Sequence, residues 1–349
     1  MSITVGINGF GPIGQSVLFT ALADPAFTVT AVVDSSVCAA YIAYVIEQEY
    51  PRRNPVAPPV RVTETQKDRI ILNDTHVIHI SSAQDPQSSL WKQYGAHYVL
   101  ECTGLYTTRG RSWGHVTGGA AGVLIAGASA DTNTVMASST PERVSASLPV
   151  CSAGAPIGAA LAPVLVALEK VVEVEHVTYT ALYGPQPPHP IGAKSEDSRD
   201  WRQARLQSYA SCAMSPSREG SAETVRALLP HLAGRLSGRT FQVPVVQGCA
   251  IDLVLHTKEP ASAEVMASAF AQAAENSEPS AKLSLSNGPI VSVDCIGHSS
   301  IMLDGASLSS SADGKVHRIV VWVDLERYFA ALLLSLVKKV YAIHTAPSV

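Results

Sequence analysis

A glycine-rich turn between two predicted β-strands is the strongest constraint on how this chain folds. Residues 2–7 form a short β-branched run, NGFGPIG follows at 8–14, apolar residues at helical spacing occupy 15–23, and a second β-type run at 27–33 ends at Asp34. A strand, a helix and a second strand in this order build parallel sheets. We therefore predict an α/β fold that begins with a Rossmann-type doubly wound parallel sheet.

The glycines of this turn have the spacing of a dinucleotide-binding motif. Gly9 permits a tight turn, Gly11 lets the backbone approach a pyrophosphate, and Gly14 allows close packing of helix on strand. The N-terminus of the helix offers unpaired N–H groups to phosphate. Asp34, twenty residues after Gly14, would accept hydrogen bonds from the adenosine ribose and favours NAD over NADP. NAD is the predicted cofactor, and a turn retained only for packing is the alternative.

The length and the later pattern of the chain indicate two domains. At 349 residues the chain is about twice the usual domain size. After a helix-spaced run at 156–171, longer β-type runs dominate at 177–183, 240–246, 249–256, 289–295 and 317–323, with helices expected at 221–233 and 262–275. We expect residues 1–153 and a C-terminal helix at 326–345 to form the Rossmann-type domain. Residues 154–325 are expected to form an α+β domain with a mainly antiparallel sheet.

Two segments between these elements have the composition of irregular structure. The proline-rich and arginine-rich segment 50–61 is expected to be an exposed loop. The segment SLSSSADGK at 307–315 is expected to be a turn.

Charge and composition exclude several kinds of partner. The net charge is −4 and no basic stripe carries interleaved aromatics, which argues against nucleic acid and anionic membranes. The six cysteines are scattered without metal-ligand spacing, so we predict no metal site. Only 15% of the residues are charged, against roughly 25% in typical domains, which predicts a homo-oligomer or a subunit of a larger assembly. The chain opens directly into a strand and has no membrane-length apolar run, so a cytoplasmic location is expected.

Several motifs together resemble one enzyme family. VGINGFGPIG, ECTG (101–104), ASAD (128–131), LLPHLAGRLSGRTFQVP (228–244) and HSSIMLDG (298–305) follow the order and spacing of motifs in glyceraldehyde-3-phosphate dehydrogenase. The resemblance covers nearly the whole chain. It implies a Rossmann-type domain and a catalytic-type domain. Family members are tetramers, but the loop around 186–220 is longer and altered in this chain, so we expect an oligomer without predicting the same tetramer. The resemblance also implies NAD contacts from Asn8, Gly9, Phe10, Gly11, Ile13, Gly14, Asp34, Thr103 and Gly104.

The chain departs from this family where the nucleophile is expected. The family's catalytic cysteine sits in ASCTTNCLAP, and this chain reads GAPIGAALAP at 154–163. Alignment on the shared LAP places Pro156 at the cysteine, Ile157 and Gly158 at the two threonines, and Ala159 at the asparagine. Proline is well tolerated in a first helical turn, since its missing N–H would be unpaired there. The substitution supports the helix and removes the nucleophile.

The other family positions with a chemical role have changed as well. The catalytic histidine falls at Tyr183, and a tyrosine with an ordinary pKa near 10 is a poor base at neutral pH. The phosphate-binding arginine is Gln242, and a threonine of the phosphate site aligns with Glu219, although extra residues in that loop leave this match open. The asparagine that meets the nicotinamide amide is Leu325, and the arginine of the glycine turn is Pro12.

No other residue is an evident replacement for the nucleophile or the base. Cys151 lies five residues before Pro156 and is interpreted as a structural thiol. Cys212 is interpreted as a packing or interface cysteine, and His176 and His189 as surface histidines. We therefore predict no catalytic residue in this chain.

Three functions are weighed on these grounds. The favoured one is a catalytically inactive family relative, a pseudoenzyme that serves as a structural, assembly or regulatory subunit and retains residual NAD binding. The alternative is an NAD-dependent aldehyde oxidoreductase with an altered substrate or mechanism, which the retained glycines and Asp34 favour. The third, a nucleic-acid-binding protein, is disfavoured by the net charge.

Overall fold

The chain divides into two units, each described by itself. The computed structural model describes residues 2–136, 149–184, 214–217, 220–245, 247–277 and 282–345. Unit 1 comprises the described residues up to Gly154 together with those from Ala330 onward. Unit 2 comprises the described residues between Ala155 and Phe329.

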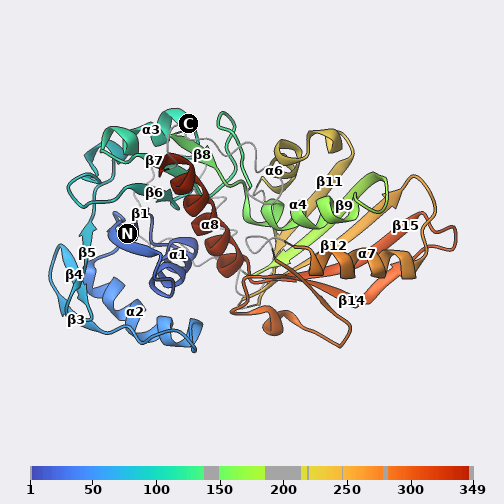
Figure 1. The fold of residues 1–349 in the computed structure, drawn as a ribbon, viewed down its shortest axis with the longest axis horizontal. Helices are drawn as coiled ribbons and strands as arrows, with labels where there is room; N and C mark the ends of the chain where they lie inside the picture. Colours follow the sequence, from blue (N-terminus) through green and yellow to red (C-terminus); the bar gives the residue numbers. More distant parts are fainter. Residues whose placement is uncertain are drawn as a thin grey trace. The chain divides into compact units, whose positions relative to one another are not determined.

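Unit 1 alternates strands and helices and ends with the long helix α8 (Figure 1). Its strands are β1 (Ile3–Asn8), β2 (Phe27–Val33), β3 (Val62–Thr65), β4 (Arg69–Leu72), β5 (His76–Ser81), β6 (Tyr98–Glu101), β7 (Gly122–Ile125) and β8 (Val150–Ser152). Its helices are α1 (Pro12–Leu22), α2 (Ala39–Arg53), the short 3-10 helix η1 (Pro86–Ser88), α3 (Arg109–Thr117) and most of α8 (Leu325–Thr345).

The sheet of unit 1 has the strand order β3-β4-β5-β2-β1-β6-β7-β8. The strands from β5 to β8 are parallel, and only β3 and β4 at one edge are antiparallel. Every residue of β6 and β7 is buried, as expected for parallel strands covered on both faces. The chain leaves β1 on one side for β2 and returns on the other for β6, which makes the switch point where such folds bind ligands.

Unit 2 is built on a second, mixed sheet of order β10-β11-β9-β12-β15-β14-β13. Its strands are β9 (Val174–Tyr183), β10 (Ser215–Ser217), β11 (Leu236–Gln242), β12 (Cys249–Thr257), β13 (Leu283–Ser286), β14 (Ile301–Ser310) and β15 (Val316–Val323). Its helices are α4 (Pro156–Leu168), α6 (Ser221–Leu228), α7 (Ala263–Glu275), and the 3-10 turns η3 (Pro230–Leu232) and η5 (Ser292–Cys295).

One face of this second sheet carries the core of unit 2. Residues of β12 alternate strictly between buried and half-buried, the pattern of a sheet covered on one face. The buried side lies under α4, α6 and α7, with α6 against β11 and α7 against β13 and β14 (Figure 1). Most pairings are antiparallel, and β9–β11 and β13–β14 are parallel. The predicted fold class is confirmed in both units.

Four local predictions were wrong or displaced. The expected loop at 50–61 begins later, because α2 continues through Pro51 to Arg53 and buries the ring of Tyr50 against Phe19. The expected strand at 289–295 contains η5 instead, where the Asp294 carboxylate accepts the Val291 N–H at 2.8 Å and closes a turn. The expected turn at 307–315 starts at 311, since β14 pairs with β15 as far as Ser310. The expected strand at 240–246 lies at 236–242, in register with β9.

A buried carboxylate ties the elements of unit 1 together at the carboxyl ends of β1 and β6. Glu101, the last residue of β6, accepts hydrogen bonds from the Asn8 amide at 2.5 Å, from the Thr103 N–H at 2.8 Å and from the Thr103 hydroxyl. Its fourth bond, at 2.9 Å, comes from Nε2 of His115 in α3. Both carboxylate oxygens are therefore satisfied without a formal counter-charge.

The tautomer of His115 follows from its second partner. The indole N–H of the fully buried Trp91 donates to His115 Nδ1 at 3.0 Å. Nδ1 is therefore an acceptor, so Nε2 carries the proton that is donated to Glu101. This chain of bonds fixes the turn after β1, the turn after β6, and helix α3 in one arrangement.

Replacing His115 with leucine tests how much this network contributes. His115→Leu removes a donor from a buried carboxylate and leaves the Trp91 N–H unpaired, so we expect the free energy of unfolding to fall by about 3–5 kcal/mol. Urea unfolding followed by circular dichroism measures the change. The exposed His97→Leu is the matched control, and a loss for His115→Leu no larger than for this control would contradict the assignment.

Candidate functional site

The glycine turn after β1 is joined to the end of β2 by backbone hydrogen bonds. Gly9 has φ +96°, a conformation that glycine adopts readily, and its N–H donates to Val33 O at 2.8 Å. The Phe10 N–H donates to the Asp34 carboxylate at 2.7 Å, and the Gln15 amide donates to Phe10 O at 3.1 Å. The turn therefore has a defined shape in the protein alone.

The three glycines of the motif differ in what surrounds them. A Cβ on Gly14 would lie 2.0 Å from Gly9 O, so this glycine is required for packing of α1 on the turn. A Cβ on Gly9 would lie 2.8 Å from Thr103 N, because the two turns touch. A Cβ on Gly11 would meet no atom within 4 Å. The backbone at Gly11 is thus open to a ligand, as the approach of a pyrophosphate requires.

Helix α1 begins at this open position with a reduced set of donors. Gly11 is its N-cap and Pro12 its first residue, and the first helical bond runs from the Gln15 N–H to Gly11 O at 2.9 Å. The N–H groups of Ile13 and Gly14 belong to the first turn, which has no intrahelical acceptors for them. Proline has no N–H, so the helix offers a phosphate one donor fewer than a non-proline residue would allow.

Asp34 lies at the end of β2, and its carboxylate has hydrogen-bond acceptor positions left for a ligand. The half-buried carboxylate accepts the Phe10 N–H on Oδ2 and the Ser36 N–H on Oδ1, both at 2.7 Å. An ionised carboxylate has about four acceptor positions. Two of them remain for hydroxyl groups such as those of a ribose, so the residues of this edge fit the adenosine and pyrophosphate part of NAD.

The turn after β6 completes this edge of unit 1. Gly104 has φ +71°, and a Cβ there would meet no atom within 4 Å. The side chains of Asn8 and Thr103 both donate to Glu101, so they shape the site from within. The structure thus gathers all the sequence-predicted NAD residues at the carboxyl ends of β1, β2 and β6, and their contact with NAD stays a prediction.

The first turn of α4, where the resemblance expects the nucleophile, is apolar. Pro156 occupies the first helical position after the N-cap Ala155, which has no side-chain cap. The Ala155 N–H donates to Thr224 Oγ1 at 2.8 Å, and that hydroxyl donates to Gly220 O at 2.9 Å. Thr224 was not predicted from the sequence, since no spacing relates it to α4. The helix entry therefore carries no nucleophilic side chain, and the Ala155 N–H already has an acceptor.

Helix α6 fills the space beside this turn. A Cβ on Gly158 would lie 2.6 Å from Ser221 O and 2.7 Å from the Thr224 Cβ. Gly158 stands at the position of a family threonine, so that threonine could not be restored without moving α6.

The second turn of α4 depends on a tyrosine of α8. Pro163 lies inside the helix and cannot supply the N–H that would normally bond to Ala159 O. The hydroxyl of the fully buried Tyr328 donates to Ala159 O at 2.9 Å instead, and burial raises the pKa of this tyrosine. The proline inside the apolar run was the available signal that an outside donor was needed here.

The residues at the family's base and anchor positions lie on elements of unit 2. Tyr183 ends β9 with a buried side chain, and Gln242 is its register partner at the end of β11. Leu325 begins α8. The preceding Asp324 is nearly buried, with its carboxylate oxygens accepting the Gly297 N–H at 2.8 Å and the Arg327 N–H at 3.1 Å. Glu219 lies outside the described residues.

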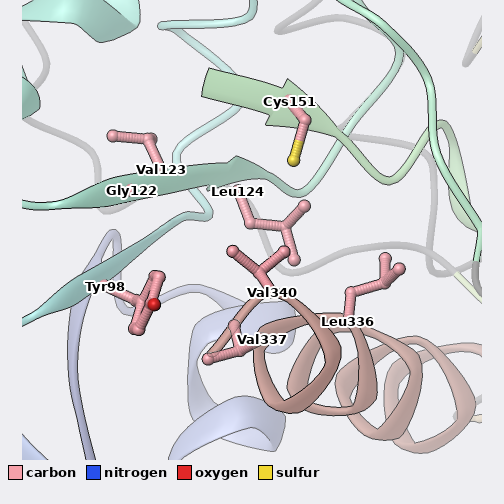
Figure 2. Close-up of a pocket in the computed structure, with 8 residues that line it drawn as sticks. All are labelled: Tyr98, Gly122, Val123, Leu124, Cys151, Leu336, Val337 and Val340. Atoms are coloured by element: carbon pink, nitrogen blue, oxygen red, sulfur yellow. The ribbon is translucent and has the colours of Figure 1, made fainter. Parts of the chain in front are cut away.

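Two of the residues weighed as alternative nucleophile or base, Cys151 and His176, lie within the described residues. Cys151 in β8 points toward Leu124, in an apolar pocket that includes Leu336 and Val340 of α8 (Figure 2). Burial there raises the pKa of its thiol to about 12. His176 is an exposed residue of β9. Cys212 and His189 lie outside the described residues. No group of three or more His, Cys, Asp or Glu side chains within the described part of the chain could hold a metal ion.

Thiol labelling tests the interpretation of Cys151 as a structural residue. With a pKa near 12, Cys151 has roughly a thousandfold less thiolate at pH 7.5 than an ordinary exposed cysteine, and the thiolate is the reactive form. We expect iodoacetamide to modify the exposed Cys38 quickly and to leave Cys151 unmodified in the folded protein. Peptide mass mapping measures both sites, and equal rates would show a reactive thiol in β8.

Comparison with known proteins finds the same family for both parts of the chain. The family model "Glyceraldehyde 3-phosphate dehydrogenase, NAD binding domain" matches residues 3–109, and "Glyceraldehyde 3-phosphate dehydrogenase, C-terminal domain" matches residues 158–325. Glyceraldehyde-3-phosphate dehydrogenases from Podospora anserina and Phaffia rhodozyma are each 29% identical to this chain. The alignments cover 97% and 98% of this chain and 98% of each relative.

A third relative gives a similar match. The cytosolic glyceraldehyde-3-phosphate dehydrogenase of Craterostigma plantagineum is 27% identical over 97% of this chain and 98% of its own length. None of the helices in the described residues is both long enough and apolar enough to cross a membrane.

Proposed function

Since the chain belongs to the glyceraldehyde-3-phosphate dehydrogenase family and carries its NAD-binding domain, we propose that it is a non-catalytic member that binds NAD and serves as a structural, assembly or regulatory subunit. In active dehydrogenases NAD supplies the hydride-accepting nicotinamide ring. This chain would bind the nucleotide without carrying out the reaction. The cytosolic name of one relative supports a cytoplasmic location.

The first turn of α4 is the observation that carries this proposal. Its residues offer no sulfur or oxygen nucleophile, and the Ala155 N–H is bonded to Thr224 rather than free to stabilise an oxyanion. Gly158 is packed too closely on α6 to be replaced by a larger residue. The loss is therefore built into the packing of unit 2 and goes beyond the exchange of one side chain.

The remaining substitutions point in the same direction. Covalent catalysis needs both a nucleophile and a base that activates it, and Pro156 and Tyr183 supply neither at neutral pH. An active oxidoreductase would also need to hold the nicotinamide ring, and Leu325 carries no polar group for that purpose. Together these losses account for many orders of magnitude in rate.

A direct assay tests the absence of catalysis. We expect no measurable reduction of NAD with glyceraldehyde 3-phosphate and phosphate, followed as NADH absorbance over hours at high protein concentration. Pro156→Cys is expected to remain inactive, because the base and the phosphate anchors are still missing. An active family member assayed in parallel provides the scale.

Two outcomes would contradict the proposal. Turnover by the natural chain at a thousandth of the rate of the active enzyme would show that another group has replaced the cysteine. NAD reduction with a non-phosphorylated aldehyde would favour the alternative of an oxidoreductase with a changed substrate.

The open face of the second sheet supports assembly with a second copy of the chain. Five apolar side chains form one row across five neighbouring strands in matched register: Phe241, Leu182, Ala250, Trp322 and Met302. The neighbouring charges Asp252 and Arg318 pair with each other, so this face adds little net charge. An apolar, nearly neutral face can be repeated on an identical partner, and members of the family are typically homotetramers. We infer that two copies pack through this row.

Charge placed in the row tests this assembly. Leu182 is 38% exposed, and Leu182→Glu would bring two buried carboxylates together at a symmetric interface. Because these like charges repel, we expect the oligomer to dissociate, and light scattering should give a lower molecular mass. Val265→Glu, at a 43% exposed position on α7 over the other face, is the matched control and should leave the mass unchanged. An unchanged mass for Leu182→Glu would contradict this interface.

A further inference from the structure

We infer that His176 and His256 form a binding site for a divalent transition-metal ion of the Zn²⁺, Cu²⁺ and Ni²⁺ class on the open face of the second sheet. The two imidazoles would supply two ligands, and water molecules would complete the coordination of the ion. This inference goes beyond the proposed function, because the pair lies in unit 2 and shares no residue with the nucleotide site or with the first turn of α4. Its outcome is therefore independent of NAD binding.

The two histidines are direct neighbours across β9 and β12, which lie side by side as an antiparallel pair (Figure 1). His176 of β9 is the register partner of His256 of β12. Residues directly opposite each other on an antiparallel pair have Cβ atoms about 4.5–5.5 Å apart. The backbone of the sheet therefore holds the two side chains together before any ion arrives, which lowers the entropic cost of binding.

A β-bulge exposes this end of β9 to solvent. The register with β12 shifts after His256, and Glu175 is the extra residue in β9. Glu175 and His176 are both exposed, whereas Val174 and Val177 on either side of them are buried. The bulge thus exposes a carboxylate next to the imidazole of His176.

The two imidazole rings need only a small movement to reach one ion together. Their centroids are 6.5 Å apart and their planes cross at 87°. A metal ion bonds to an imidazole nitrogen at about 2.0–2.1 Å, which places the centroids of two rings on one tetrahedral ion roughly 5 Å apart. The χ2 angle of histidine is broadly distributed, so rotation of the exposed His176 ring can close this difference.

The ring nitrogens of both histidines are open to a ligand. Within the residues that the structure describes, no protein group hydrogen-bonds to the imidazole of His176 or of His256. By contrast, the rings of His115, His231 and His317 all hydrogen-bond to other side chains. Imidazole is the commonest metal ligand among side chains and suits Zn²⁺, Cu²⁺ and Ni²⁺. The pair therefore presents two such ligands side by side.

The charged residues nearest to the pair in sequence leave one carboxylate unpaired. Lys258, two residues after His256, directs its ammonium group to both carboxylate oxygens of Glu173 at 3.2 Å. Glu175 has no ion-pair partner among the described side chains, so its negative charge remains next to His176. Solvent screens this exposed charge, and its attraction for a divalent ion adds modestly to the two nitrogen ligands.

The pair is separate from the apolar row that we assign to the contact between copies. His176 lies six residues from Leu182 along β9, about 20 Å at the usual rise of a strand. An ion at the pair would therefore link two strands of one chain and need not take part in that contact. It would stabilise the folded chain, because the unfolded chain does not hold the two ligands together.

Protection from diethyl pyrocarbonate, which modifies free imidazole nitrogens, tests the inference on the full-length protein. We expect Zn²⁺ at micromolar concentration to slow the modification of His176 and His256 at least tenfold, as measured by peptide mass mapping. The exposed His298 of the same unit is the internal control and should react at the same rate with and without Zn²⁺. Mg²⁺ should protect neither member of the pair, since it prefers oxygen ligands.

Single substitutions show whether the two histidines share one ion. The second bond to an ion already held by the protein benefits from a high effective concentration, so loss of either ligand should weaken binding at least tenfold. We expect His256→Gln to abolish the protection of His176, and the reciprocal His176→Gln to abolish that of His256. His298→Gln is the matched control and should leave both protected.

Two results would overturn the inference. One is protection of His176 that persists in His256→Gln, which would show that each histidine binds an ion separately. The other is a lack of protection of both histidines up to millimolar Zn²⁺. Neither result would bear on the proposed binding of NAD, which is measured separately.

Discussion

The shape of the nucleotide-binding edge depends on the carboxylate of Glu101, which is buried away from solvent. Burying a carboxylate is costly unless donors satisfy it, and Glu101 is satisfied by Asn8, Thr103 and His115. Each of these donors comes from a different stretch of the chain, so the carboxylate is fully satisfied only when all three are in place. The two turns that frame the site are therefore positioned by the interior of the unit. A ligand would find the edge already arranged and would not have to organise it.

In unit 1 the packing leaves the ligand-binding edge open, whereas in unit 2 the packing fills the place where a reactive centre is expected. Around the start of α4, the space and the hydrogen bonds that a reactive centre would use serve cohesion instead. Thr224 bonds to the Ala155 N–H, and α6 approaches Gly158 so closely that no side chain fits there. The two units thus differ in what their packing leaves open. Unit 1 keeps an open backbone at Gly11 and an Asp34 carboxylate with acceptor positions left, whereas the first turn of α4 in unit 2 is tightly packed.

Much of this was predictable from the sequence, and the exceptions have physical reasons. The glycine motif and the strand pattern predicted the α/β sheet because backbone conformation and burial periodicity are local properties. Helix α2 extends into the segment that was expected to be a loop, because the burial of Tyr50 outweighs the local effect of Pro51. Sequence spacing could not predict the contact of Thr224 with Ala155, or the bonds from Trp91 through His115 to Glu101, since these join residues brought together only by the fold. Alignment showed which side chains had been lost, and the structure shows what occupies their surroundings.

The hydrogen bond from the Tyr328 hydroxyl to the Ala159 carbonyl holds α4 at a point that is separate from the N-terminus of the helix. Pro163 leaves that carbonyl without its normal partner in the second turn of α4, and a side chain from α8 supplies the bond. The helix is thus anchored one turn away from the end where a nucleophile would be displayed. Substitutions at that end leave the anchor untouched. Such an arrangement makes the stability of the helix independent of the side chains at its N-terminus, so residues there can change without loss of the scaffold.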